Sequence, residues 1–445
     1  MSAIPATRRM MHLGLFILGT GSHVAGWRQP AAVTSFEDFS AVQQIAATAE
    51  RGLFDLIFMG DNLYADPAAH PSYTSRLEPL TMLSALATST SRIGLGATAS
   101  TTYGDPFTVA RAFASLDHIS GGRAAWNAVT TANAVSAANF GRDHPDHGQR
   151  YAIAEEFLSV VRGLWDCWDD DAVVKNRASG LYIDPKKVRA LDHEGPFFQV
   201  KGPLNISRSP QGQPVVFQAG GSAPGQRLAA RTADVVFSVV QDLAEARVQY
   251  AGFKAQLSAF GRQAEHVALL PGVMPVVGRT DREAFDRLGA LQGFLSDESA
   301  IQLLSDRFGT DMSIYDLDGP VPDLELPDSY HSFAGVMLSK ARRDRFSLRD
   351  VYNLMGAARG HWVLCGSAER IADTLQLWFE TGAADGFNVM PPFFHEGFTD
   401  FVDGVVPILQ ERGLFRTAYE GETLRDHLGL ERPARGEWPA RLGRV

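Results

Sequence analysis

The fold is decided by residues 92–130, which read RIGLGATASTTYGDPFTVARAFASLDHISGGRAAWNAVT. A short apolar run at 92–99 is followed by a segment of helical period at 106–119 and by a second apolar run at 123–130. Strand, helix and strand in this order form the unit from which parallel sheets covered by helices are built. The stretch therefore predicts an α/β protein.

The same alternation extends in both directions along the chain. Strands are predicted at 12–18, 54–60, 92–99, 123–130, 214–220, 233–240, 267–278 and 386–392. Helices are predicted at 37–51, 78–90, 106–119, 151–165, 242–260 and 368–379. Eight parallel strands are the number that closes a barrel. The sequence thus predicts a (β/α)8 TIM barrel, and a doubly wound open sheet is the alternative.

The chain of 445 residues is longer than the roughly 250 that such a barrel needs. The excess falls near 168–213 and near 295–360, and we expect both to be insertions at C-terminal-face loops of one domain spanning 1–445. The stretch 316–332 in the second insertion is rich in Asp, Pro and Ser. It is expected to form a mobile lid.

Composition narrows the range of partners and compartments. A net charge of −10 without a long run of Lys or Arg argues against nucleic acid or a membrane surface as a partner. Cys167 and Cys365 are far apart in sequence, so neither a disulfide framework nor a thiolate metal site is indicated. Arg8-Arg9 precedes an apolar run, but the run is short and lacks the cleavage site of an export signal. We therefore expect a cytoplasmic protein.

Polar side chains stand where the predicted strands end, which is where barrel enzymes place their functional groups. Asp61 follows the second predicted strand, Thr101 follows the third, and Asn127 lies near the end of the fourth. The alternative interpretation is ordinary turn chemistry, for which Asp, Asn and Thr are also selected.

Residues 218–225 read QAGGSAPG and join a predicted strand to a helix. Gly221 would let backbone N–H groups face a phosphate, with Ser222 and the positive end of the helix beside them. Standing alone, the segment is equally a capped turn. Residues 19–24, GTGSHV, lack the third glycine of a dinucleotide fingerprint, so an NAD-type Rossmann domain is not indicated.

The segment HGQRY at 147–151 places His147, Arg150 and Tyr151 at the start of a helix. Together they would hold a phosphate. His144 next to His147 imitates part of a metal site, but a third ligand is missing, so no metal is expected.

His23 and His361 are the remaining candidates for proton transfer or substrate contact. His23 follows the first predicted strand, and His361 precedes a strand-like run at 362–365. The sequence contains no G-x-S-x-G elbow and no H-E-x-x-H, so acyl transfer and zinc hydrolysis are not indicated.

Six segments follow one another along nearly the whole chain: SHVAGWR at 22–28, ERGLFD at 50–55, LDHISGGR with WN between 116 and 127, HGQRY at 147–151, ADGFN at 384–388 and GETLR at 421–425. This ordered series resembles the bacterial-luciferase-like flavin monooxygenases. The resemblance is to the branch that contains nitrilotriacetate, EDTA and dibenzothiophene-sulfone monooxygenases.

The resemblance implies a role for each candidate residue. Those implied to contact the flavin ring and ribityl chain are Asp61, Thr101 and Asn127, and those implied to hold the FMN phosphate are His147, Tyr151, Gly221 and Ser222. Those implied to line the substrate side are His23, Trp27 and His361, with His23 and His361 also implied to be catalytic. The sequence departs from the commoner pattern in having Met59-Gly60-Asp61 where Leu-Ala-Asp is usual, and Gly221 where a second Ser often stands.

The resemblance also implies the chemistry. Reduced FMN (FMNH2), supplied by a separate NAD(P)H:flavin reductase, would react with O2 to a C4a-(hydro)peroxide or a related flavin peroxide. One oxygen atom would then enter a small organic substrate of the aminopolycarboxylate, sulfone, alkane or heterocycle class. A homodimer or homotetramer formed through barrel helices is expected. The alternatives are a deazaflavin-dependent hydride transfer on the same barrel and a non-catalytic flavin-binding protein.

Overall fold

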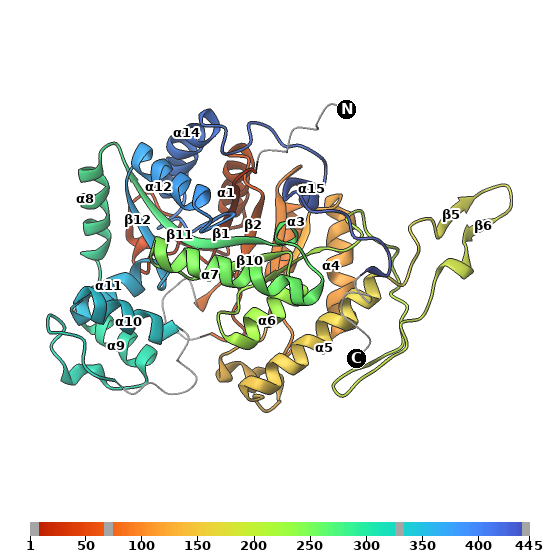
Figure 1. The fold of residues 1–445 in the computed structure, drawn as a ribbon, viewed down its shortest axis with the longest axis horizontal. Helices are drawn as coiled ribbons and strands as arrows, with labels where there is room; N and C mark the ends of the chain where they lie inside the picture. Colours follow the sequence, from red (N-terminus) through yellow and green to blue (C-terminus); the bar gives the residue numbers. More distant parts are fainter. Residues whose placement is uncertain (1–8, 66–73, 325–332, 438–445) are drawn as a thin grey trace.

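The computed structural model describes residues 9–65, 74–324 and 333–437. Eight parallel strands pair in a closed ring in the order β1-β2-β3-β4-β9-β10-β11-β13 (Figure 1). They are β1 (His12–Ile17), β2 (Leu56–Met59), β3 (Gly94–Ser100), β4 (Ala124–Val129), β9 (Val215–Gln218), β10 (Val235–Ser238), β11 (Ala268–Gly278) and β13 (Gly386–Val389). Each coincides with a predicted strand. The barrel is therefore confirmed, and the open sheet is wrong because β1 pairs with β13.

Helices cover the outside of the barrel (Figure 1). They are α1 (Phe39–Arg51), α3 (Pro79–Leu86), α4 (Pro106–Ser120), α5 (His147–Trp165), α6 (Ala223–Thr232), α7 (Leu243–Gln256), α8 (Asp281–Gln292), α12 (Ala368–Glu380), α13 (Glu396–Asp400) and α14 (Val406–Glu411). Their ends follow capping chemistry: the Asp105 carboxylate accepts from Thr108 N (2.8 Å) at the start of α4, and Gly121 ends this helix with φ 71°. Within the described residues, no helix is long and apolar enough to cross a membrane.

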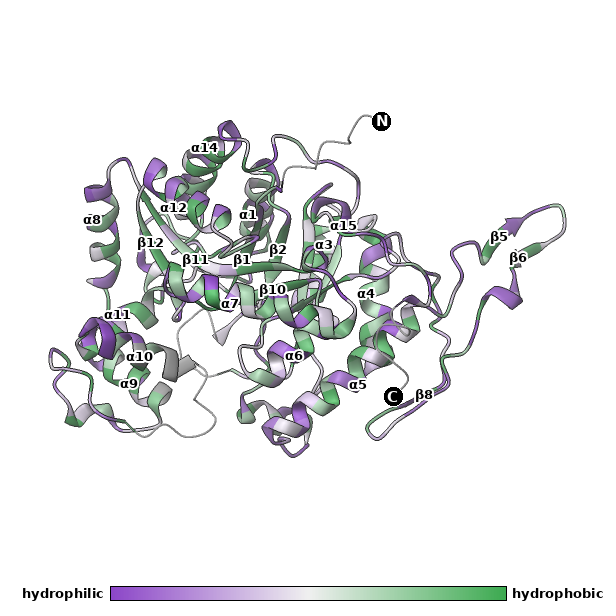
Figure 2. Ribbon diagram, in the orientation of Figure 1, coloured by the Kyte–Doolittle hydropathy of each residue, from purple (hydrophilic) through white to green (hydrophobic). Residues whose placement is uncertain are grey.

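Alternate strand residues point into the barrel, where aromatic rings form a packed layer. Phe58 is the centre of this layer, with ring centroids 5.0 Å from Phe16 and 5.8 Å from both Phe217 and Phe237. The other strand face packs against the helices, so the strands are apolar on both sides. In Figure 2 much of the central sheet accordingly has the green of hydrophobic residues. This explains why the strands read as apolar runs in the sequence.

The N-terminal rim of the barrel is closed by the C-terminal segment of the chain. Leu424, in α15 (Leu424–His427), packs among the buried residues inside the barrel. The neighbouring Arg425 guanidinium donates to the Asp234 carboxylate (3.1 Å) and to Gln213 O (3.0 Å), and all three residues are buried. A ligand site inside the barrel must therefore open at the other rim.

A ninth strand, β12 (Trp362–Ser367), lies outside the ring of eight. It pairs with the second half of β11, from Val273 to Gly278, whereas the first half of β11 pairs with β10 and β13. The strand-like character of 362–365 is thus confirmed, and the strand places His361 at the point where β11 leaves the barrel.

The first insertion does not lie at the C-terminal face, which corrects that expectation. It follows α5 and precedes β9, and a segment between a helix and the next strand lies at the N-terminal rim of a barrel. It contains two short hairpins, one of β5 (Val173–Asn176) with β6 (Leu181–Ile183), and one of β7 (His193–Glu194) with β8 (Gln199–Val200).

The second insertion lies over the C-terminal rim, as expected. Its helices α9 (Asp297–Phe308), α10 (Phe333–Asp344) and α11 (Leu348–Ala358) share an apolar cluster of their own. It contacts the segment after β1, because Val24 N donates to Gly356 O (2.8 Å) and Arg28 Nη1 donates to Phe294 O (2.8 Å). Of the expected lid at 316–332, residues 325–332 lie outside the described part.

Candidate active site

The strands bring five of the predicted site residues to the C-terminal rim. His23 follows β1, Asp61 follows β2, Thr101 follows β3, Ser222 follows β9, and Asn127 lies within β4 near its end. In a parallel barrel these positions all lie at the same end. Because the opposite rim is closed, this rim is the candidate active site.

A cradle for an anion forms where α5 and α6 begin. Ser222 caps α6, since its Oγ accepts from Gly225 N (3.3 Å), and the same Oγ donates to Tyr151 Oη (3.2 Å). Tyr151 and the exposed His147 lie one turn apart on α5, with ring centroids 5.0 Å apart. Helix N-termini carry free N–H groups and a positive partial charge, so the arrangement fits a phosphate.

The two glycines of the cradle differ in what surrounds them. A Cβ at Gly220 would lie 3.0 Å from Tyr151 Oη and 2.9 Å from Gly225 Cα, so packing requires glycine there. A Cβ at Gly221 would meet nothing within 4 Å. Gly221 therefore borders open space of the kind that a bound anion needs, and its lack of a side chain is not a packing requirement.

Arg150 is not part of this cradle, contrary to the expectation that it helps to hold a phosphate. Its Nη1 donates to His144 Nε2 (2.9 Å) and to Pro145 O (2.8 Å). Arginine only donates, so the proton of the neutral His144 ring must be on Nδ1, which contacts Tyr103 Oη at 2.7 Å. Burial and Arg150 both lower the pKa of His144, which keeps the ring neutral. Arg150 thus orders the loop before α5 and does not face the cradle.

The neighbouring histidines do not assemble a metal site. Among the described residues, there is no group of three side chains of the kinds that bind metals. His144 is instead held between Tyr103 and Arg150.

Unpaired polar atoms gather near the ends of the strands. Of the buried atoms that lack a hydrogen-bond partner among the described residues, six lie in or next to the strands of the barrel: Thr20 Oγ1, His23 Nε2, Asn127 Oδ1, Gln218 Nε2, His361 Nδ1 and Asn388 Oδ1. Buried polar atoms are normally paired, so a cluster of donors and acceptors at one rim indicates a ligand with polar atoms of its own.

The orientation of Asn127 is set by its neighbours. Thr98 Oγ1 donates to Met59 O (2.7 Å), and Asn127 Nδ2 donates to Thr98 Oγ1 (2.9 Å). The amide oxygen of Asn127 is therefore left to accept from a ligand. The hydroxyl of Thr101 already donates its proton, because its Oγ1 donates to Val129 O (3.1 Å). Toward a ligand this hydroxyl can therefore only accept a hydrogen bond.

Both candidate catalytic histidines are buried and neutral. Burial lowers the pKa of His23 to about 4, and burial together with Arg359 lowers that of His361 to about 3. Ala25 N donates to His23 Nδ1 (3.1 Å), so the proton of His23 is on Nε2. The His361 ring stacks on Phe237, with centroids 4.7 Å and planes 3° apart. Near neutral pH both rings act as neutral hydrogen-bonding groups rather than as acids.

Asp61 and Trp27 lie in contrasting surroundings. Burial raises the pKa of Asp61 to about 6, although the positive charge of Arg76 partly opposes the shift. Trp27, in the short helix η1 (Gly26–Arg28), is 39% exposed and so lies at the outer edge of the rim.

Two residues of the rim, Thr98 and Gly272, were missed in the sequence. Thr98 orients Asn127, and its inward position two residues before Ser100 follows from strand alternation. Gly272 has no sequence signal, yet a Cβ there would lie 2.7 Å from Phe237 and 2.9 Å from Met390 Sδ, and closer still to His361 Nδ1. Gly272 therefore makes the space in which His361 stacks.

Comparison with known proteins agrees with this geometry. The family model described as luciferase-like monooxygenase matches residues 11–385. The chain is 46% identical over 431 residues to N-acetyl-S-(2-succino)cysteine monooxygenase of Bacillus subtilis, covering 96% of this chain and 98% of the relative. It is 44% identical over 442 residues to nitrilotriacetate monooxygenase component A of Aminobacter aminovorans, covering 96% and 97%.

Two solved structures of related enzymes superimpose on most of the chain. EDTA monooxygenase from Chelativorans sp. BNC1 superimposes with a TM-score of 0.83 at 33% identity, covering 95% of this chain and 99% of that one. Riboflavin lyase, solved with modified FMN and riboflavin, has a TM-score of 0.83 at 31% identity, covering 95% and 96%.

The residues present fit a flavin. The cradle of α5 and α6 offers donors to a phosphate, and the unpaired atoms of Asn127, His23 and His361 offer hydrogen bonds to a polar ring system. The aromatic layer below them supplies an apolar floor. Taken with the matched relatives, this shows that the chain belongs to the luciferase-like monooxygenase family and is a flavin-dependent monooxygenase.

Proposed function

We propose that the protein is the oxygenase component of a two-component system that uses reduced FMN and O2 to oxygenate a small organic substrate. The observation that supports this most strongly is the cluster of unpaired buried polar atoms beside an open anion cradle. Such a rim is suited to a cofactor that carries both a phosphate and a polar ring.

Each predicted residue receives a role in this proposal. Those of the cradle, for the phosphate, are His147, Tyr151, Gly221 and Ser222, and those for the ring and ribityl chain are Asp61, Thr101 and Asn127. When bound, the reduced flavin supplies the electrons that activate oxygen. The protein supplies binding, orientation and exclusion of water.

His23, Trp27 and His361 face the substrate in the proposal. His361 is held by stacking on Phe237 and is neutral, so it positions the substrate by hydrogen bonding without adding charge. His23 offers the N–H of Nε2 in the same way. The aromatic layer and the second insertion keep water from the reacting atoms.

A separate NAD(P)H:flavin reductase is the proposed source of the reduced flavin. One relative is named as component A of nitrilotriacetate monooxygenase, which implies at least one further component in that system. Because reduced FMN can diffuse between proteins, any reductase that releases it should support turnover here.

Carboxylate-bearing amines and thioethers are the favoured substrates. Arg359 is close enough to His361 to lower its pKa, and Arg76 has the same effect on Asp61, so two positive charges lie near the rim. The substrates named for the two most similar relatives reported above, N-acetyl-S-(2-succino)cysteine and nitrilotriacetate, carry carboxylates near sulfur or nitrogen. Sulfones, alkanes and heterocycles are the remaining classes.

The test is a turnover assay with a general flavin reductase, NADH, FMN and a panel drawn from all four classes. The proposal expects oxygenated product only with reduced FMN and oxygen present, and highest with the carboxylates. Product formed anaerobically from a reduced deazaflavin would instead support hydride transfer. Flavin binding without turnover of any panel member would favour a non-catalytic protein.

A further inference from the structure

Thr131, the second residue after β4, has a strained backbone. Its φ is 38°, and among the described residues other than glycine that have a positive φ, it is the one with a β-branched side chain. A side chain branched at Cβ clashes with the backbone in this left-handed region, so the surrounding structure must hold such a residue in place. Strain of this kind gathers at functional sites, and Thr131 lies at the C-terminal rim of the barrel.

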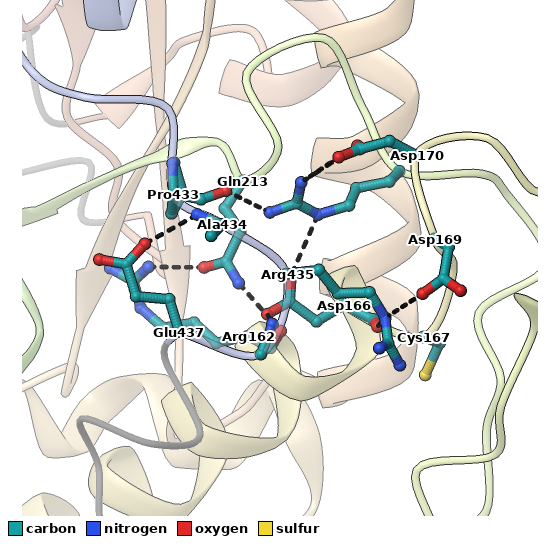
Figure 3. Close-up of polar contacts among 12 residues, drawn as sticks. Arg162, Asp166, Cys167, Asp169, Asp170, Gln213, Pro433, Ala434, Arg435 and Glu437 are labelled. Carbon is teal, nitrogen blue, oxygen red and sulfur yellow. Dashed lines mark hydrogen bonds and ion pairs between the residues drawn. The ribbon is translucent and has the colours of Figure 1, made fainter.

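Near the opposite rim, a turn of the same hand uses glycine. The C-terminal segment turns at Gly436, which has a φ of 77°. Paired charges fasten this segment to the end of α5, among them Arg435 Nε with the Asp169 carboxylate at 2.8 Å (Figure 3). Glycine adopts a positive φ without steric cost. A threonine in this conformation therefore needs a favourable contact of its side chain to offset the strain.

The hydroxyl of Thr131 supplies that contact and fastens the end of β4 to the end of β3. Thr131 Oγ1 donates to Ser100 Oγ (2.7 Å). The same Ser100 oxygen accepts from Thr102 N and Tyr103 N (both 3.1 Å), and Thr102 Oγ1 donates back to Thr130 O (2.9 Å). Because Ser100 is buried, the bond between the two hydroxyl groups is shielded from water.

The chain after β4 forms what we call the rim strap, residues 131–140. At its far end Phe140 stacks on Tyr103, which follows β3, with ring centroids 4.7 Å and planes 5° apart. Asn139 Nδ2 donates to Leu63 O (2.8 Å), in the segment after β2. The rim strap is therefore fastened at both ends to the segments that follow β2 and β3, which carry residues assigned above to the flavin.

The rim strap also covers a polar atom. Ser136 is 1% exposed, and its Oγ has no hydrogen-bond partner among the described residues. Buried hydroxyl groups are normally paired. Ser136 thus adds one more atom to the unpaired polar groups already described at this rim.

We propose that Thr131 is a positioning residue for the flavin: its hydroxyl, by holding a strained backbone on Ser100, sets the course of the rim strap and the spacing of the ends of β3 and β4. Thr101 follows β3 and Asn127 lies near the end of β4, so the places of both depend on this fastening. The inference rests on the proposed function for the identity of the ligand. The fastening itself involves only groups of this chain, so it can be measured without flavin.

Three substitutions at position 131 separate the strain from the hydrogen bond. Thr131→Ser keeps the hydroxyl, and Thr131→Val keeps the branched shape without the hydroxyl. Thr131→Gly removes the hydroxyl and the strain together. The matched control is Lys175→Gly in the hairpin of β5 and β6 at the opposite rim, where the φ of an exposed lysine is 49°.

Three quantities are measured for each protein: the melting temperature, hydrogen exchange of the backbone amides of residues 131–140 without flavin, and the affinity for reduced FMN by anaerobic titration. Thr131→Val should melt below the wild type, whereas Thr131→Gly should melt close to it, because relief of strain offsets the lost bond. Both should speed exchange in the rim strap and weaken binding of reduced FMN, each at least about tenfold. Thr131→Ser and Lys175→Gly should match the wild type in exchange and in affinity.

Unchanged exchange of the rim strap in both Thr131→Gly and Thr131→Val would overturn the proposed fastening. Faster exchange with an unchanged affinity for reduced FMN would overturn the positioning role and leave Thr131 a purely structural residue. A wild type that does not bind reduced FMN would contradict the proposed function and the ligand named here, while the exchange rates would still decide whether Thr131 fastens the rim strap.

Discussion

Gly272 supports His361 by having no side chain, and Gly272→Ala tests this directly. A methyl group here would lie 2.7 Å from Phe237 and 2.9 Å from Met390 Sδ, distances that real Cβ atoms do not show, and it would also overlap His361 Nδ1. The backbone at Gly272 cannot move away, because β11 is paired with β10 on one side and with β13 on the other. The side chains must therefore move, and the stacked His361 ring is the one in closest contact.

The expected cost in folding free energy is about 1–3 kcal/mol, the range found when methyl groups are forced into packed cores. The functional effect should be larger, since a displacement near 1 Å at a reacting centre costs up to about 100-fold in rate. We expect Gly272→Ala to melt a few degrees lower, to keep its affinity for reduced FMN, and to lose product formed per oxygen consumed on the order of tenfold.

The assay measures melting temperature, flavin affinity by anaerobic titration, and product per oxygen with the best carboxylate substrate. Gly289→Ala in α8 is the matched control, because a Cβ there meets nothing within 4 Å, and it should behave as the wild type. A Gly272→Ala protein with unchanged melting temperature and unchanged coupling would refute the packing argument.

Three further predictions follow from single groups of the rim. The pKa of Asp61 is raised to about 6 in the folded protein, so its ionised form opposes folding. In thermal melts above pH 6, Asp61→Asn should therefore stabilise the protein by about 1 kcal/mol, a figure discounted for the partial exposure of the side chain. Below pH 4 the substitution should give no gain in stability. His361→Ala should keep flavin binding but release more peroxide per oxygen consumed, and equal coupling in a peroxide assay would remove His361 from the mechanism. Tyr103→Phe removes the acceptor of His144 Nδ1–H, so it should lower the free energy of unfolding measured in denaturant by about 1 kcal/mol. It should also speed hydrogen exchange of the backbone amides of residues 144–147. Unchanged exchange would contradict the role assigned to Tyr103.

The strands of the barrel could be predicted because they are buried on both faces. Each one shows in the sequence as an apolar run, and β1, β4 and β11 coincide with predicted ranges. The prediction that the first insertion lies at the C-terminal face was wrong, and the order of predicted elements in the sequence already argued against it. A segment at 168–213 comes directly after a predicted helix, and connections from a helix to the next strand lie at the N-terminal rim.

The site was predictable where it depends on strand ends and not where it depends on side-chain direction. Asp61 and Thr101 stand after strands and Asn127 near a strand end, so the pattern of the fold placed them. Arg150 stands one residue before Tyr151, yet its guanidinium turns to His144, and adjacent residues on a helix do not face the same way. The need for glycine at 272 depends on Phe237 in β10, on Met390 after β13 and on His361 before β12, and no local sequence pattern indicates these contacts.

In the function proposed above, this rim holds reduced FMN with its phosphate at the start of α6. The most direct measurement is an anaerobic titration of the wild type and of Gly220→Ala with reduced FMN and with reduced riboflavin, which lacks the phosphate. We expect the wild type to bind reduced FMN at least about tenfold more tightly than reduced riboflavin. Gly220→Ala should lose this difference, because a Cβ would press on Tyr151 and Gly225. Equal affinities in the wild type, or no binding of reduced FMN, would contradict the proposed function.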